Sequence, residues 1–103
     1  MGKFVVVASE SALAAGRARV FEVGAHTVAV FALGGRVHAL EDVCPHAGGP
    51  LSEGRVEGGT VTCPWHGARF EIATGASVGE LRCPDVRCHR VRVSGGSVEI
   101  EEP

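Results

Sequence analysis

Tyrosine is absent from this chain, and aromatic residues of all kinds make up only 5% of its 103 residues. Long apolar runs are also lacking, since the longest uninterrupted stretches are only a few residues and about 20 are needed to span a bilayer. No segment with the charged and then apolar pattern of a signal peptide precedes Phe4. We therefore expect a cytoplasmic protein that has no membrane partner.

An excess of positive charge is missing as well. Ten basic residues stand against twelve acidic ones, which gives a formal net charge of -2. A chain with this balance has no overall positive field that would attract a nucleic acid or an anionic membrane. We therefore expect no nucleic-acid partner.

The length and composition favour one folded all-β domain over residues 1–103. A chain of this size has no room for both a catalytic domain and a cofactor domain. The apolar fraction of 45% and the charged fraction of 21% are typical of a protein with a core. Fifteen glycines and five prolines indicate many tight turns between short strands. We expect such a domain to be a monomer.

Three β-rich runs follow one another early in the chain, at Arg19–Val23, His26–Leu33 and Arg36–Leu40. Breaks that contain glycine, Gly24-Ala25 and Gly34-Gly35, separate them, and this pattern predicts a meander of hairpins. No internal repeat is visible in the sequence. The other expected strands are Lys3–Val7, Gly59–Cys63, Ala68–Ile72, and a last hairpin of Arg87–Val93 with Ser97–Glu101. Stacked antiparallel sheets would then form the scaffold.

Residues 42–67 break the strand pattern and contain the candidate metal ligands. The sequence reads Cys44-Pro45-His46, then sixteen residues, then Cys63-Pro64-Trp65-His66. Two thiolates and two imidazoles suit zinc or an iron–sulfur cluster. A zinc site usually takes one pair of cysteines and one pair of histidines, whereas each pair here is mixed. If the two loops face each other, both cysteines reach one metal and both histidines reach its neighbour, as in an asymmetrically ligated [2Fe–2S] cluster.

This motif resembles that of the Rieske ferredoxins, in which C-x-H and C-x-x-H are separated by about sixteen residues. The resemblance extends through HAGGPLSEG at 46–54 and CPWHGARFEIATG at 63–75, and covers nearly the whole chain. It implies the Rieske fold and one [2Fe–2S] cluster per chain, held by two loops at about 44–50 and 63–69. The cofactor-binding residues would be Cys44 and Cys63 on one iron, and His46 and His66 on the other iron, at the surface.

The resemblance also indicates where the reduction potential lies. Two neutral imidazoles leave the oxidised site with no net charge, which places Rieske centres at roughly -150 to +300 mV. In the high-potential members, an additional cysteine in each loop forms a disulfide, and a serine and a tyrosine donate hydrogen bonds near the cluster. Here Gly49 and Trp65 replace the cysteines, Ala68 replaces the serine, and tyrosine is absent. Fewer hydrogen bonds to the sulfurs predict the low-potential end of the range.

The function that the resemblance implies is one-electron transfer rather than catalysis. Rieske ferredoxins of bacterial ring-hydroxylating oxygenase systems accept an electron from an NAD(P)H-dependent reductase and deliver it to a terminal oxygenase. Transient docking is expected near His46 and His66, on a surface rimmed by Pro45, Pro64 and Trp65. We expect Trp65 to shield the cluster from water.

Two other interpretations remain open. Within the same fold, the chain could be the small Rieske-like subunit of an assimilatory NAD(P)H nitrite reductase, although members of that subfamily can lack the four ligands that are present here. In a different class, zinc could staple the two loops of a redox-silent binding module. Such a protein would be colourless, whereas a Rieske protein is brown.

The remaining cysteines and histidines are expected to have structural roles rather than to bind a metal. Cys83 and Cys88 are expected to pack as small apolar side chains, because a reduced cysteine behaves like a small hydrophobe. His26, His38 and His89 lie on expected strands and are interpreted as ordinary sheet residues. Several arginines near the end of the chain are expected to form a solvated face: Arg82, Arg87, Arg90 and Arg92.

Replacement of a histidine ligand tests the ligand assignment. We predict that His66→Cys lowers the midpoint potential strongly, toward the roughly -400 mV of four-thiolate clusters, because the added negative charge makes reduction less favourable. A potentiometric titration of the purified variant measures this shift. An unchanged potential would contradict the assignment.

Overall fold

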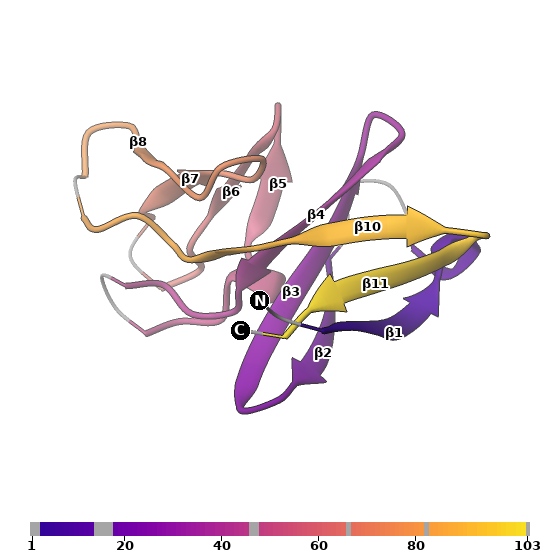
Figure 1. Cartoon of the computed structure of the whole chain (residues 1–103). Helices are drawn as coiled ribbons and strands as arrows, with labels where there is room; N and C mark the ends of the chain where they lie inside the picture. The colour runs from indigo at the N-terminus through magenta and orange to yellow at the C-terminus, as the bar shows by residue number, and fades with distance from the viewer. Residues whose placement is uncertain (1–2, 14–17, 46–47, 66, 82, 103) are drawn as a thin grey trace.

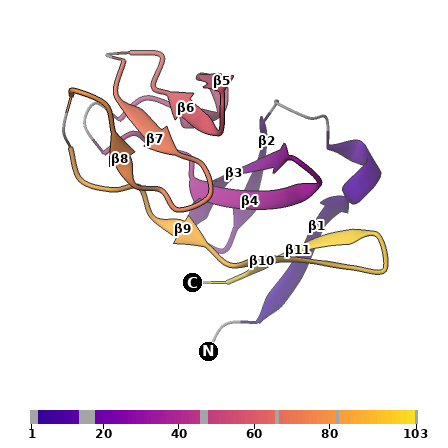
Figure 2. The same cartoon turned by 90° about the horizontal axis from the view of Figure 1, so that it is seen from above.

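Three antiparallel sheets stack as layers in the computed structural model, which describes residues 3–13, 18–45, 48–65, 67–81 and 83–102 (Figures 1 and 2). The terminal sheet contains β1 (Phe4–Ser9), β11 (Ser97–Glu101) and β10 (Val91–Ser94), in that order. The central sheet contains β2 (Ala18–Val23), β3 (His26–Leu33), β4 (Arg36–Glu41) and β9 (Cys88–His89). The short-strand sheet contains β5 (Arg55–Glu57), β6 (Thr60–Thr62), β7 (Arg69–Glu71) and β8 (Ser77–Val78).

Among the described residues, helical structure is limited to two 3₁₀ turns of three residues each, η1 (Glu10–Ala12) and η2 (Leu51–Glu53). A helix of about 20 residues is needed to cross the hydrocarbon core of a bilayer. In the part of the chain that the structure describes, no helix is long and apolar enough to do so.

The central sheet is the middle layer, and the burial of β3 shows why. Residues 28–31 of this strand are all buried. Val28 and Val30 belong to the core shared with the terminal sheet, whereas Ala29 and Phe31 belong to the core shared with the short-strand sheet. Because alternate residues of a strand point to opposite faces, a strand covered on both faces must be apolar without interruption. Figure 2 shows the two other sheets on either side of it.

The hairpin turns use glycine where the backbone requires a positive φ. Gly34 and Gly35, between β3 and β4, have φ angles of +54° and +80°. Two consecutive positive φ angles are typical of the type I′ turn, whose twist matches that of the strands it joins. The meander expected from the sequence is therefore confirmed in β2, β3 and β4, including their order.

Gly75, in the turn between β7 and β8, contacts the segment that leads into β9. Its carbonyl oxygen accepts a 2.8 Å hydrogen bond from the Val86 N–H, and its φ is +81°. A Cβ at this position would collide with the Val86 carbonyl oxygen. The absence of a side chain at Gly75 thus allows the backbone of Val86 to lie directly against the turn that follows β7.

Part of the strand prediction was wrong. The run Arg87–Val93, expected to be one strand of the last hairpin, is divided at Arg90 between two sheets. Its first half, β9, pairs with β4 in the central sheet, and its second half, β10, pairs with β11 in the terminal sheet. The short strands β5 and β8 were not predicted, because two or three residues show no clear alternation.

Candidate metal centre

The first cysteine loop is closed by two backbone hydrogen bonds. The Cys44 N–H donates to the Gly49 carbonyl at 2.8 Å, and the Gly48 N–H donates to the Cys44 carbonyl at 2.6 Å. Gly48 has a φ of +79°, in the left-handed region that glycine adopts without steric cost. The loop begins three residues after the end of β4, so the central sheet fixes its start.

The second cysteine loop has the same construction. The Cys63 N–H donates to the Ala68 carbonyl at 2.7 Å, and the Gly67 N–H donates to the Cys63 carbonyl at 3.1 Å. Gly67, like Gly48, lies four residues after the cysteine and has a φ of +79°. Both loops share the pattern C-P-x-x-G, a short internal repeat that the sequence analysis missed. The repeat places the two cysteines at equivalent positions of two like loops.

The two loops meet through a residue that has no side chain. A Cβ added at Gly49 would lie 3.1 Å from the Cys63 Sγ and 2.9 Å from Cδ2 of the Trp65 ring. Gly49 therefore allows the backbone of the first loop to approach the thiol and the ring of the second. Gly49 and Trp65, which the resemblance places at the disulfide positions of high-potential members, lie against each other.

The cysteine side chains lie inside the apolar core. Cys44 and Cys63 are each only 1% exposed, and both belong to the cluster of buried residues that includes Leu51, Phe70 and Ile72. Two buried thiols on facing loops are the thiolate half of the ligand set that a Rieske cluster needs, so the described residues fit this group. His46 and His66 lie outside the described residues.

The outer side of the loops is exposed and largely apolar. Trp65 is 59% exposed and Val43 is 41% exposed, and Pro45 and Pro64 are exposed beside them. Ala68 is fully buried and has no hydroxyl to donate a hydrogen bond. The site thus combines a buried interior with an exposed apolar rim.

Asp42 secures the first loop at its base. Its carboxylate accepts hydrogen bonds from the Ser52 N–H at 2.6 Å and from the Ser52 hydroxyl at 2.9 Å. Residues 42 and 52 lie on either side of the loop, and η2 begins at Leu51. These two bonds hold together the chain that enters the loop and the chain that leaves it.

Cys83 and Cys88 have different environments. Cys83 is partly buried against the core, as expected, and its N–H donates to the Ser77 hydroxyl at 3.3 Å. Cys88 is exposed, so the expectation that it packs as a buried apolar side chain was wrong. Partial burial still raises the pKa of the Cys88 thiol above its ordinary value. Neither cysteine forms a disulfide.

The three arginines of the expected solvated face that the structure describes are exposed: Arg87, Arg90 and Arg92. Arg92 pairs with Glu99 on the neighbouring strand at 2.7 Å, and its guanidinium lies 4.1 Å from the centre of the Phe4 ring. Arg82 lies outside the described residues.

The central sheet brings together a second group of side chains, which was not predicted from the sequence. His89 Nε2 lies 2.7 Å from Glu41 Oε1, and His26 Nδ1 lies 3.1 Å from the same oxygen. Burial raises the pKa of Glu41, but hydrogen bonds from His89 and His26 and the attraction of their rings lower it by more. The net pKa of Glu41 therefore lies below its ordinary value of 4.5. The histidines had been interpreted as unrelated strand residues, because only strand register shows that they meet.

The sequence matches the model of a known protein family. Residues 3–90 match the family model described as the Rieske [2Fe-2S] domain. The chain therefore belongs to the Rieske family, as its loops and buried cysteines indicate, and proteins of this kind carry one [2Fe–2S] cluster.

Similarity to particular proteins extends over most of the chain. The ferredoxin component of biphenyl 2,3-dioxygenase from Rhodococcus jostii is 34% identical over 92% of this chain and 89% of its own length. A structure of carbazole 1,9a-dioxygenase, described as a complex of reduced oxygenase and oxidized ferredoxin, contains a chain that matches with a TM-score of 0.89 and 31% identity. That match covers 96% of this chain and 93% of the other. The small subunit described for an NADH-dependent nitrite reductase from Mycobacterium tuberculosis matches with a TM-score of 0.86 and 25% identity, over 98% and 96% of the two chains.

The contact at Gly49 can be tested by adding one methyl group. We predict that Gly49→Ala destabilises the protein by about 1–3 kcal/mol and lowers its cluster content, because the new Cβ crowds the Cys63 sulfur and the Trp65 ring. Chemical unfolding and iron per chain measure the two effects. Gly58→Ala is the control, since nothing lies within 4 Å of its added Cβ and only backbone strain results. Equal effects of the two variants on cluster content would contradict the loop contact.

The lowered pKa of Glu41 predicts how its contribution to stability changes with pH. A carboxyl whose pKa is lower in the folded state stabilises the fold above its unfolded pKa, and this contribution is lost as the pH falls through the folded value. Glu41→Gln should therefore cost about 1–3 kcal/mol at neutral pH, and less below about pH 4.5. Urea unfolding midpoints across this range measure the difference. Glu53→Gln, at an exposed position, should show little change; a cost for Glu41→Gln that is constant with pH would contradict the argument.

Proposed function

We propose that this chain is a one-electron carrier in a multicomponent oxygenase system. It accepts an electron from an NAD(P)H-dependent reductase and passes the electron to a terminal oxygenase of the ring-hydroxylating type. The observation that carries the proposal is the pair of like loops, which bury Cys44 and Cys63 and meet at Gly49. The similarity to dioxygenase ferredoxins along most of the chain supports it.

The proposed ligands are the four residues of the motif, in a single domain over residues 1–103. Cys44 and Cys63 would hold one iron through sulfur, and His46 and His66 would hold the other through imidazole nitrogen. When bound, the [2Fe–2S] cluster supplies a one-electron couple. This role is the transfer of an electron rather than catalysis, as for the dioxygenase ferredoxin components that the chain resembles.

The residues around the cysteines control the environment of the couple. Burial of Cys44 and Cys63 in the core keeps water away from the sulfurs, and a drier site is less favourable for added negative charge. Gly49 and Trp65 stand where the high-potential members have their disulfide cysteines, so no disulfide can form there. Ala68 stands where those members have a serine, so it has no hydroxyl to donate a hydrogen bond. The serine and tyrosine hydroxyls that donate hydrogen bonds near the cluster in high-potential members have no counterpart in this sequence, which places the potential at the low end of the Rieske range.

The exposed rim suits a brief encounter with a partner. Val43, Pro45, Pro64 and Trp65 form an apolar surface beside the loops, and the positions of His46 and His66 lie within the same loops. Electron-transfer complexes use small interfaces that release quickly. An exposed tryptophan is the type of residue that often dominates the binding energy of such a patch. We propose this rim as the docking surface for both reductase and oxygenase.

The alternatives receive less support. The nitrite reductase small subunit has the same fold, but its identity to this chain is 25%, against 34% for the biphenyl dioxygenase ferredoxin. A zinc-stapled module would place a single metal between the loops, and it does not account for a family match that covers residues 3–90.

Reconstituted electron transfer tests the proposal. The holoprotein is mixed with a purified NADH-dependent ferredoxin reductase and a ring-hydroxylating dioxygenase, and product formation is followed with and without the chain. We predict that product forms only with the chain present, and that Trp65→Ala raises the apparent KM for the carrier about tenfold. The matched control is Val93→Ala on β10, which is 42% exposed and belongs to the terminal sheet rather than to the cysteine loops.

Two outcomes would count against the proposal. A holoprotein that the reductase cannot reduce, or that the oxygenase cannot reoxidise, would contradict the carrier function. An unchanged KM for Trp65→Ala, with the midpoint potential measured to be the same as before, would instead contradict only the docking surface.

A further inference from the structure

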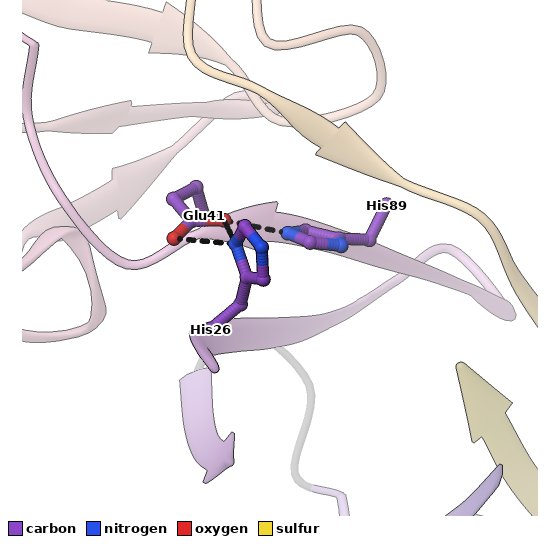
Figure 3. Close-up of side chains that lie close together, drawn as sticks. All are labelled: His26, Glu41 and His89. Carbon is purple, nitrogen blue, oxygen red and sulfur yellow. Dashed lines mark hydrogen bonds and ion pairs between the residues drawn. The ribbon is translucent and has the colours of Figure 1, made fainter. Parts of the chain in front are cut away.

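Three side chains remote from the cysteines converge on one point of the central sheet. His26 begins β3, Glu41 ends β4, and His89 ends β9. In Figure 3 a nitrogen of each ring is directed at the Glu41 carboxylate. His26 Nδ1 lies 3.1 and 3.2 Å from the two carboxylate oxygens, and His89 Nε2 lies 2.7 Å from Oε1. Nothing in the proposed electron transfer uses these residues.

The register of the sheet explains why these side chains meet. Glu41 lies opposite Val28, and His89 lies opposite Ala39. His26 is two residues before Val28, and Ala39 is two residues before Glu41, so all three side chains project from the same face of the central sheet. This is the face that packs against the terminal sheet. The arrangement is set by backbone pairing along three strands.

Burial gives the group one closed side and one open side. The His89 side chain is only 2% exposed, and this residue is the one buried polar or charged residue in the described part of the chain. The side chains of Glu41 and His26 are 21% and 29% exposed. The two rings are nearly perpendicular, with centres 5.6 Å apart. A small ion could therefore approach from the His26 side and reach all three groups.

We propose that His26, Glu41 and His89 form a binding site for one Zn²⁺ ion, distinct from the [2Fe–2S] centre. Two imidazole nitrogens and one carboxylate oxygen, with the fourth position open to water, are an established ligand set for zinc. The ligand atoms are His26 Nδ1, His89 Nε2 and a Glu41 oxygen, and all lie within 4.8 Å of one another.

Small side-chain movements would bring the three groups to the distances of an occupied site. Zinc bonds of about 2.0–2.1 Å at a tetrahedral angle place neighbouring ligand atoms about 3.3 Å apart. The nitrogen–oxygen distances here are 2.7 to 3.2 Å, so the carboxylate has to retreat from His89 by about 0.6 Å. The two ring nitrogens, which lie within 4.8 Å of each other, have to approach to about 3.3 Å. Each ring binds as the neutral tautomer whose proton lies on its other nitrogen, and the metal bonds replace the hydrogen bonds to Glu41.

A bound ion would connect three strands close to the first cysteine loop. β9 pairs with β4 through only two residue pairs, Ala39 with His89 and Leu40 with Cys88. Glu41 precedes Cys44 by three residues. Zinc at this position would therefore strengthen the attachment of β9 and the base of the loop, and it would raise the unfolding temperature of the holoprotein.

Isothermal titration of the holoprotein with zinc chloride tests the proposal, with the visible absorption recorded throughout to show that the cluster stays intact. We expect one zinc ion per chain, and an affinity about 100-fold lower or more in His26→Asn and in Glu41→Gln. Two control variants should bind as the unsubstituted protein does. His38→Asn changes a histidine on the opposite face of β4, and Cys88→Ser removes the exposed thiol beside His89.

Anomalous diffraction at the zinc edge then locates the ion, and a peak between the three side chains would confirm the site. Absence of binding at millimolar zinc would overturn the proposal. So would binding that persists in both ligand variants, or that is lost in the Cys88→Ser control. None of these results depends on electron transfer, so the site can fail while the proposed function stands.

Discussion

The close approach of the two cysteine loops is the constraint on which the rest of the structure depends. The loops share one pattern of backbone hydrogen bonds and meet where Gly49 has no side chain. Each loop is held by regular structure: the first starts three residues after β4, and the second runs from the end of β6 to the start of β7. The central and short-strand sheets therefore serve to hold two thiols in fixed positions, with a core packed around them.

The two facing loops and their buried cysteines could be expected from the sequence because the signals for them are local, whereas the four-residue ligand set stays a prediction. The cysteine and histidine spacing and the glycine four residues after each cysteine lie within short segments, and so do the strands around Gly34-Gly35. Predictions failed where the outcome depends on distant parts of the chain. Nothing near Arg90 indicates that the strand changes sheet there, because the choice depends on whether β4 or β11 offers the available edge. The meeting of His26 with His89 likewise requires the register of three strands.

The three sheets have different roles in the molecule. The short-strand sheet and the loops bury the cysteines and leave an apolar rim that includes Trp65. The terminal sheet covers the other face of β3 and β4, and its β10–β11 turn lies at the end of the molecule farthest from the loops (Figure 1). The group formed by His26, Glu41 and His89 lies on the face between these layers. The cysteines and this group therefore lie on opposite faces of the central sheet.

The central claim is that two facing loops hold a Rieske cluster of low potential, and a potentiometric titration followed by EPR tests it most directly. The reduced protein is expected to give a rhombic signal with a g value that averages near 1.9, below the ~2.0 of a free electron, and a midpoint near the roughly -150 mV end of the Rieske range. A midpoint far above zero would indicate quinol-oxidising chemistry instead. The absence of any signal from metal-loaded protein would contradict the cluster itself.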